Sequence, residues 1–132
     1  DLFERPKTTF VGYFIGSPAM NLFESEVLSD YEVKVGNLVI KTSSNLSKLK
    51  TKNIKLGIRS EFIEIAKEPG QNIIEANVNR VEDFGNFKLI TASMGKNLIK
   101  SKIDREEPVS DGTVNLYFPP EKCCVYYDNK LV

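Results

Sequence analysis

The sequence TFVGYFIGSPAMN, from Thr9 to Asn21, decides the fold because it is the most apolar and least strand-like stretch of the chain. Its apolar side chains recur at helical spacings, and Pro18 ends any helix that they begin. These side chains are Phe10, Val11, Phe14 and Ile15. We expect a short helix, an exit through Gly16, Ser17 and Pro18, and a first strand from Met20 to Leu28. Such a helix needs an apolar surface, which we expect to be the inner face of the sheet that follows.

Length and composition favour one neutral, soluble domain. The chain has 132 residues, of which 41% are hydrophobic, enough for one core. Its 18 basic and 18 acidic residues leave no net charge, which disfavours a dedicated nucleic-acid or acidic-membrane binder. We find no apolar run of membrane-spanning length and no signal-peptide pattern. The opening residues DLFERP resemble the tail of a preceding segment, so we interpret the chain as an excised domain.

Strands and turns follow the apolar segment. Gly36-Asn37 between alternating residues predicts a tight hairpin, and Ser43 or Ser44 is expected to cap a short turn carrying Leu46 and Leu49. In the second half the alternation changes phase after Val78, which predicts a bulge near Asn79-Arg80.

Further turns are expected at Gly85-Asn86 and Asp111-Gly112, and a last strand runs from Cys124 to Tyr127. About nine short strands with almost no helix indicate a mainly β fold, a closed or nearly closed antiparallel barrel or sandwich. We recognise no internal repeat.

The sequence offers little chemistry. It has no histidine, so the commonest general base and metal ligand are missing, and its glycines form no phosphate-binding loop. Cys123 and Cys124 are adjacent and are not expected to pair with each other; Cys124 lacks an activating base and is interpreted as a half-buried strand residue. Glu82 and Asp83 point to opposite faces of a strand, which favours a solvated loop entrance over an acid–base pair. The lysines 48, 50, 52 and 55 are interpreted first as a solvated loop and second as an anion site.

Four motifs carry a family resemblance that spans nearly the whole chain. They are FVGYFIGSPAMN (Phe10 to Asn21), LGIRSEF (Leu56 to Phe62), VEDFGN (Val81 to Asn86) and FPPEKCCVYYD (Phe118 to Asp128). In this order they resemble the carboxy-terminal regulatory domain, of the transport-associated OB (TOBE) type, of the ATP-binding subunits of ABC importers for maltose, other oligosaccharides and glycerol-3-phosphate. The chain departs from the family at Ser60, where proline is usual, and at Phe62 and Cys124, where histidine is usual or frequent.

The resemblance implies an OB-like antiparallel β-barrel with a short N-terminal helix. Residues 1–18 would be the linker and helix that leave an absent ATPase domain, and residues 19–132 the barrel. The family's structural motifs fall on Gly16, Ser17, Pro18, Asn21, Gly57, Arg59 and Glu61.

The residues of the second motif also have a meaning of their own. Gly57 in an apolar strand predicts a bend or a close approach of other groups. Arg59 and Glu61 are two apart on a strand and are expected to form an ion pair at the barrel end, in preference to a role for Arg59 in holding a ligand anion.

The resemblance further implies a non-catalytic regulatory and dimerisation domain without catalytic, metal or cofactor residues. The full-length subunit would bind ATP and Mg²⁺, form a homodimer and contact its own ATPase domain, two membrane permease subunits and cytoplasmic regulatory proteins. It would be cytoplasmic and peripheral to the inner face of the membrane. The alternative is an OB module that binds a small oxyanion such as molybdate or single-stranded nucleic acid, although most Phe and Tyr positions follow the apolar phase of their strands.

Two segments are candidates for the dimer or regulatory interface. The N-terminal segment is apolar nearly all round, so one side is left for a partner after the other packs on the barrel. The loop after the predicted bulge is the second candidate, because bulges re-aim side chains at barrel rims. The candidate residues are Phe10, Phe14, Ile15, Glu82, Phe84 and Gly85.

Overall fold

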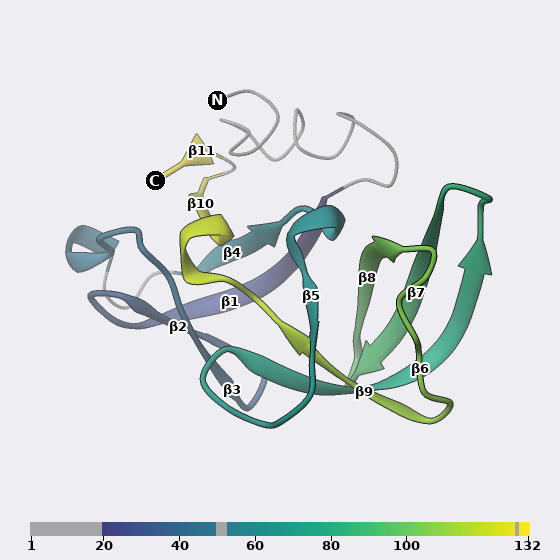
Figure 1. The fold of residues 1–132 in the computed structure, drawn as a ribbon. Helices are drawn as coiled ribbons and strands as arrows, with labels where there is room; N and C mark the ends of the chain where they lie inside the picture. The colour runs from purple at the N-terminus through teal and green to yellow at the C-terminus, as the bar shows by residue number, and fades with distance from the viewer. Residues whose placement is uncertain (1–19, 50–52, 129) are drawn as a thin grey trace.

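The computed structural model describes residues 20–49, 53–128 and 130–132, which form two antiparallel sheets with three short 3-10 helices (Figure 1). Sheet A contains, in order across it, β11 (Lys130–Leu131), β10 (Cys124–Tyr127), β4 (Asn53–Ile58), β1 (Asn21–Ser29), β2 (Glu32–Val35) and β3 (Leu38–Lys41). Sheet B contains β5 (Glu64–Ala66), β9 (Thr113–Tyr117), β6 (Ile73–Asp83), β7 (Phe87–Met94) and β8 (Asn97–Asp104). The 3-10 helices are η1 (Ser47–Leu49), η2 (Ser60–Phe62) and η3 (Pro120–Lys122). The predicted N-terminal helix lies outside the described residues.

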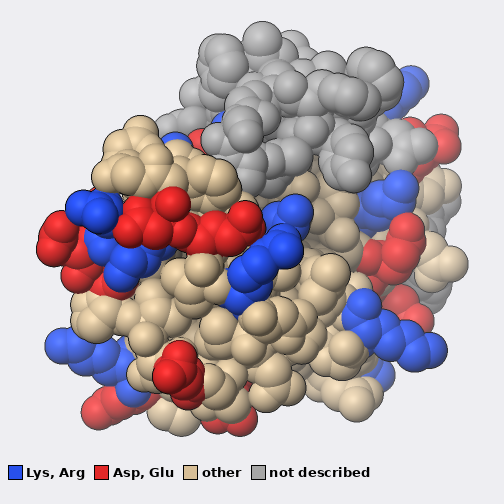
Figure 2. Space-filling view, turned by 90° about the vertical axis from the view of Figure 1, so that its right-hand side faces the viewer, with Lys and Arg blue, Asp and Glu red and all other residues tan. Residues whose placement is uncertain are grey.

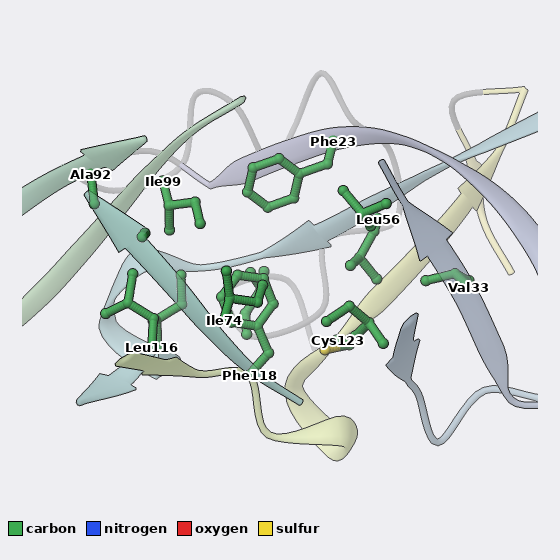
Figure 3. Close-up of a cluster of buried hydrophobic side chains, with 14 of the residues drawn as sticks. Phe23, Val33, Leu56, Ile74, Ala92, Ile99, Leu116, Phe118 and Cys123 are labelled. Atoms are coloured by element: carbon green, nitrogen blue, oxygen red, sulfur yellow. The ribbon is translucent and has the colours of Figure 1, made fainter. Parts of the chain in front are cut away.

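The core fills the space between the two sheets (Figure 3). Phe23 and Leu56 enter it from sheet A and Ile74 and Leu116 from sheet B, and all four side chains are buried. The ring of Phe118 stacks on that of Phe23 with centroids 6.1 Å apart. Each fully buried side chain of this size contributes about 1.5–3 kcal/mol. The predicted mainly β, OB-like architecture is confirmed. No helix in the described residues has the length and hydrophobicity needed to cross a lipid bilayer.

The two sheets are built from two related halves of the chain, so the expectation that there is no internal repeat is wrong. The segment NLFESEV (21–27) corresponds to NIIEANV (72–78), GNLVIK (36–41) to GKNLIK (95–100) and LGIRSE (56–61) to LYFPPE (116–121). Strands β1 to β4 of the first half match β6 to β9 of the second in order and pairing.

The fifth strand of each half crosses to the other half's sheet. β5 of the first half pairs with β9, and β10 of the second half pairs with β4. The registers are equivalent, because Glu64 lies opposite Tyr117 and Cys124 lies opposite Gly57. This exchange gives the two halves a shared core, so neither half is expected to fold alone.

Two buried asparagines join the sheets at equivalent places, and we call them the asparagine clasps. The side chain of Asn21 accepts from Lys100 N (2.8 Å) and donates to Lys100 O (2.9 Å) and Ile58 O (3.2 Å). The side chain of Asn72 accepts from Lys41 N (2.8 Å) and donates to Lys41 O (2.8 Å) and Phe118 O (2.7 Å). Each amide thus pairs with an edge strand as a neighbouring strand would, which protects the edge and closes the barrel.

The local turns agree in large part with the sequence. The Gly36-Asn37 hairpin is confirmed by the pairing of Val35 with Leu38, and the bulge by a register shift between Val78 and Arg80. Ser43 or Ser44 was expected to cap the turn with Leu46 and Leu49, and at that turn the backbone N–H of Ser47 donates to Asn45 Oδ1 at 2.9 Å. η1 begins later than expected because this asparagine satisfies its first donor.

Candidate interface on the β6–β7 hairpin

The β6–β7 hairpin carries the described part of the predicted interface. Phe84 is 53% exposed at its tip, and Gly85 takes a positive φ of 92° that completes the turn. The Phe84 backbone N–H donates to Phe87 O at 2.9 Å. Phe10, Phe14 and Ile15, the other predicted interface residues, lie outside the described residues, as do Gly16, Ser17 and Pro18.

A stack of three side chains holds the exposed ring in place. The rings of Phe84 and Phe87 stack with centroids 5.1 Å apart and an interplanar angle of 24°. The ammonium group of Lys102 on β8 lies 4.5 Å from the centroid of Phe87. Such aromatic and cation–π contacts order a side chain before a partner arrives, which reduces the entropy lost on binding.

Two ion pairs engage the carboxylates at the end of β6. Arg80 Nε lies 3.2 Å from Glu82 Oε1, so the carboxylate of Glu82 is already engaged. Arg105 Nε lies 3.1 Å from both carboxylate oxygens of Asp83, and the Gly85 N–H donates to Asp83 Oδ1 at 2.8 Å. The Gly85 N–H, and after it Arg105, hold the pKa of Asp83 below its ordinary value because they stabilise the charged form.

The hairpin does not have the surroundings of a catalytic acid pair. Glu82 and Asp83 pair with different arginines. Within the described part of the chain, no group of three or more His, Cys, Asp or Glu side chains is placed to hold a metal ion.

The other predicted motif residues lie at the barrel ends and seams. Arg59 is buried, and its Nε donates to Glu61 Oε2 at 2.8 Å, so the predicted ion pair is present, although Glu61 lies in η2 and not on a strand. A Cβ on Gly57 would lie 2.5 Å from Met20 Cε and 2.9 Å from Tyr126 Cε2, which is the predicted close approach. Cys123 and Cys124 form no disulfide and are fully buried, so Cys124 is more buried than expected.

Sequence reasoning identified Asn21 as a motif residue but missed Asn72, its partner clasp. The two motifs NLFESEV and NIIEANV share Asn, Glu and Val at the same spacing, and that pattern was the available signal. The structure brings Asn72 to Lys41 and Phe118, which are far from it in sequence.

Comparison with known proteins supports the resemblance. The family model "MalK OB fold domain" matches residues 16–63. The glycerol-3-phosphate import ATP-binding protein UgpC 2 of Agrobacterium fabrum is 32% identical over 85% of this chain and 30% of its own length. The trehalose/maltose import ATP-binding protein MalK of Thermococcus litoralis is 28% identical over 96% of this chain and 37% of its own length. The chain therefore spans about a third of the curated relatives it matches.

A solved structure shows the same fold. The crystal structure of the cytoplasmic molybdate-binding protein ModG with molybdate bound aligns with 86% of this chain and 98% of its own, with a TM-score of 0.65 and 10% sequence identity. This likeness concerns the fold alone. The family model and the import ATP-binding proteins, by contrast, show that the chain resembles the OB-type domain of the ATP-binding subunits of sugar and glycerol-3-phosphate ABC importers.

Proposed function

We propose that this chain is a non-catalytic regulatory and dimerisation domain of the ATP-hydrolysing subunit of a sugar or glycerol-3-phosphate ABC importer. One observation carries the proposal. The matches cover most of this chain but about a third of each relative, so most of each import ATP-binding protein lies outside the match. ATP and Mg²⁺ would bind in that other part, and a homodimer of such subunits would contact two permease subunits at the cytoplasmic face of the membrane.

The β6–β7 hairpin is the surface that we assign to regulation and dimerisation. It presents one ordered, exposed aromatic ring among paired charges, which is the composition of an interface hot spot with a polar rim. Its partner would be the ATPase domain or the second copy of this domain. A biological contact at this surface would bury roughly 1,000 Å² or more.

The test compares hairpins in the full-length subunit. Phe84→Glu should weaken dimerisation, measured by sedimentation over a range of concentrations, because a carboxylate would be buried in the contact. The matched control is Tyr31→Glu, at the shorter β1–β2 hairpin, where an exposed aromatic residue is equally available for substitution. If both variants dimerise as the wild type does, the interface assignment is wrong.

Two further measurements test the function itself. The chain alone, incubated with ATP and Mg²⁺, should show no hydrolysis above buffer, and turnover would contradict a non-catalytic role. Calorimetric titration with molybdate, sulfate and a short oligonucleotide tests the alternative, and tight binding of any of them would favour it. Figure 2 shows acidic and basic side chains mixed on one face of the molecule, and that face lacks the one-sided basic surface of a nucleic-acid binder.

A further inference from the structure

The outer face of sheet A carries a second apolar cluster, separate from the core. The residues from Cys123 into β10 alternate: Cys123 and Val125 belong to the core, whereas Cys124 and Tyr126 belong to the second cluster. Together with neighbouring residues they form what we call the outer-face cluster: Met20, Leu22, Cys124, Tyr126 and Leu131, grouped over Gly57.

This cluster is buried although it faces away from the core. Cys124 and Tyr126 are 0% and 1% exposed. The Tyr126 hydroxyl lies 3.7 Å from Met20 Sδ, so the methionine closes over the tyrosine. Burial this complete on the outer side of a sheet indicates a covering layer, to which Met20, Leu22 and Leu131 belong.

Gly57 marks the outer-face cluster as a specific feature of sheet A. Its counterpart in the second half, opposite the other crossing strand, is Tyr117. At Gly57 the space for a side chain is taken by Met20 and Tyr126. The absence of a side chain lets groups from outside the strand lie directly on the backbone of β4.

The apolar segment Phe10–Ile15 is joined to this cluster by a short stretch of sequence. Met20 belongs to the cluster, and five residue steps separate it from Ile15. At about 3.3–3.6 Å per residue the Ile15 Cα therefore lies within roughly 18 Å of the Met20 Cα. The inner face of the sheets, where this segment was expected to pack, is already filled by the core.

We propose that Phe10–Ile15 docks on the outer-face cluster and adds to the layer over Cys124 and Tyr126. A segment that is apolar nearly all round needs such a surface on one side, and its tether lets it reach this one. The contact anchors the point at which the chain enters the barrel. It is independent of the assignment to a transport subunit, so either conclusion can fail without the other.

The two cysteines provide the test in the whole chain. In a Cys123→Ala background, replacing Phe10 and Phe14 by serine should raise the rate of Cys124 modification by a thiol reagent, Ellman's reagent, by roughly tenfold or more. In a Cys124→Ala background the same two substitutions should leave the core thiol of Cys123 unreactive. The control Phe84→Ser should change neither rate. If the two serine substitutions make neither Cys124 nor Cys123 more reactive, the proposal is wrong.

If both thiols become reactive, the substitutions have unfolded the protein and the thiol test does not discriminate. A cross-linking scan then tests the same contact. With both native cysteines replaced by alanine, Leu22→Cys is combined in turn with a cysteine at Phe10, Val11, Phe14 or Ile15. After mild oxidation of a dilute sample, mass spectrometry should detect an intramolecular disulfide from at least one of these positions. A pair of Leu22→Cys with Phe84→Cys is the control and should form none. Absence of a disulfide from all four positions would overturn the proposal.

Discussion

The two halves of the barrel share one plan and differ most in the length of one hairpin. Val27 pairs with Val33 in the first half and Val78 with Ala92 in the second. Beyond these equivalent pairs lie the five residues 28–32 and the thirteen residues 79–91. The short hairpin suffices to complete its half of the barrel, so closure of the fold does not require the extension. The extension holds Phe84 and Arg80, so the comparison separates the residues that build the barrel from the surface that we propose for a partner.

The largest predicted effect tests whether the halves are energetically equivalent. Asn72→Leu and Asn21→Leu should each lower the free energy of unfolding by about 3 kcal/mol or more, because each removes the partner of two part-buried backbone groups of an edge strand and of one buried carbonyl, that of Phe118 or Ile58. Urea unfolding followed by circular dichroism measures the change, and Asn86→Ala, at an exposed turn position, should cost below about 0.5 kcal/mol.

Equal losses in the free energy of unfolding at Asn21 and Asn72 would show that the two asparagine clasps stabilise the fold to the same extent. A loss below about 1 kcal/mol at either asparagine would contradict a stabilising role for that clasp. Leaving a buried hydrogen-bonding group without its partner lowers the free energy of unfolding by at least that much.

A smaller effect on the free energy of unfolding is predicted at Gly57, where the second half of the chain has Tyr117 instead. Gly57→Ala should cost about 1–2 kcal/mol, since the new methyl group meets Met20 and Tyr126. Met20→Ala should remove most of that cost, because the nearest contact is the end of the Met20 side chain.

The same double-mutant cycle with Gly85→Ala serves as the control. Gly85 has open space around it and is strained only by its positive φ, so Met20→Ala should give no rescue there. Additive costs of Gly57→Ala and Met20→Ala would show that crowding above β4 is not the reason for the glycine.

The sequence predicts the scaffold better than the relation between its halves. Local signals were sufficient at Gly36-Asn37 and at the bulge before Arg80, because turn chemistry and alternation act over a few residues. The repeat was missed because the spacing between corresponding residues is not constant. Asn21 and Asn72 are 51 positions apart, whereas Gly36 and Gly95 are 59 apart, with the longer hairpin between them.

The candidate interface was predicted in part for the same reason. A bulge next to an apolar residue pointed to Phe84, whose exposure agrees with an interface role. The partners that order it could not be predicted, because Lys102 and Arg105 come from β8 and the loop after it and meet the hairpin only through the register of the sheet. Long-range register depends on the whole fold, and no local pattern encodes it.

The smallest effect concerns the charge that braces the extension. Because the folded state holds the pKa of Asp83 below its ordinary value of 3.8, the hydrogen bond from Gly85 and the ion pair with Arg105 contribute stability above that pH, and this contribution is lost as the pH falls through the lowered pKa. Arg105→Gln should move the pKa of Asp83, followed by NMR titration of its carboxyl carbon, upward toward 3.8 without reaching it, because the Gly85 N–H, the larger cause, remains. Added salt should produce a shift in the same direction in the wild type and almost none in the variant, since this solvent-exposed pair is screened by ions. An unchanged pKa in Arg105→Gln would show that the turn alone sets the charge of Asp83, and the arginine would then be free to serve a partner.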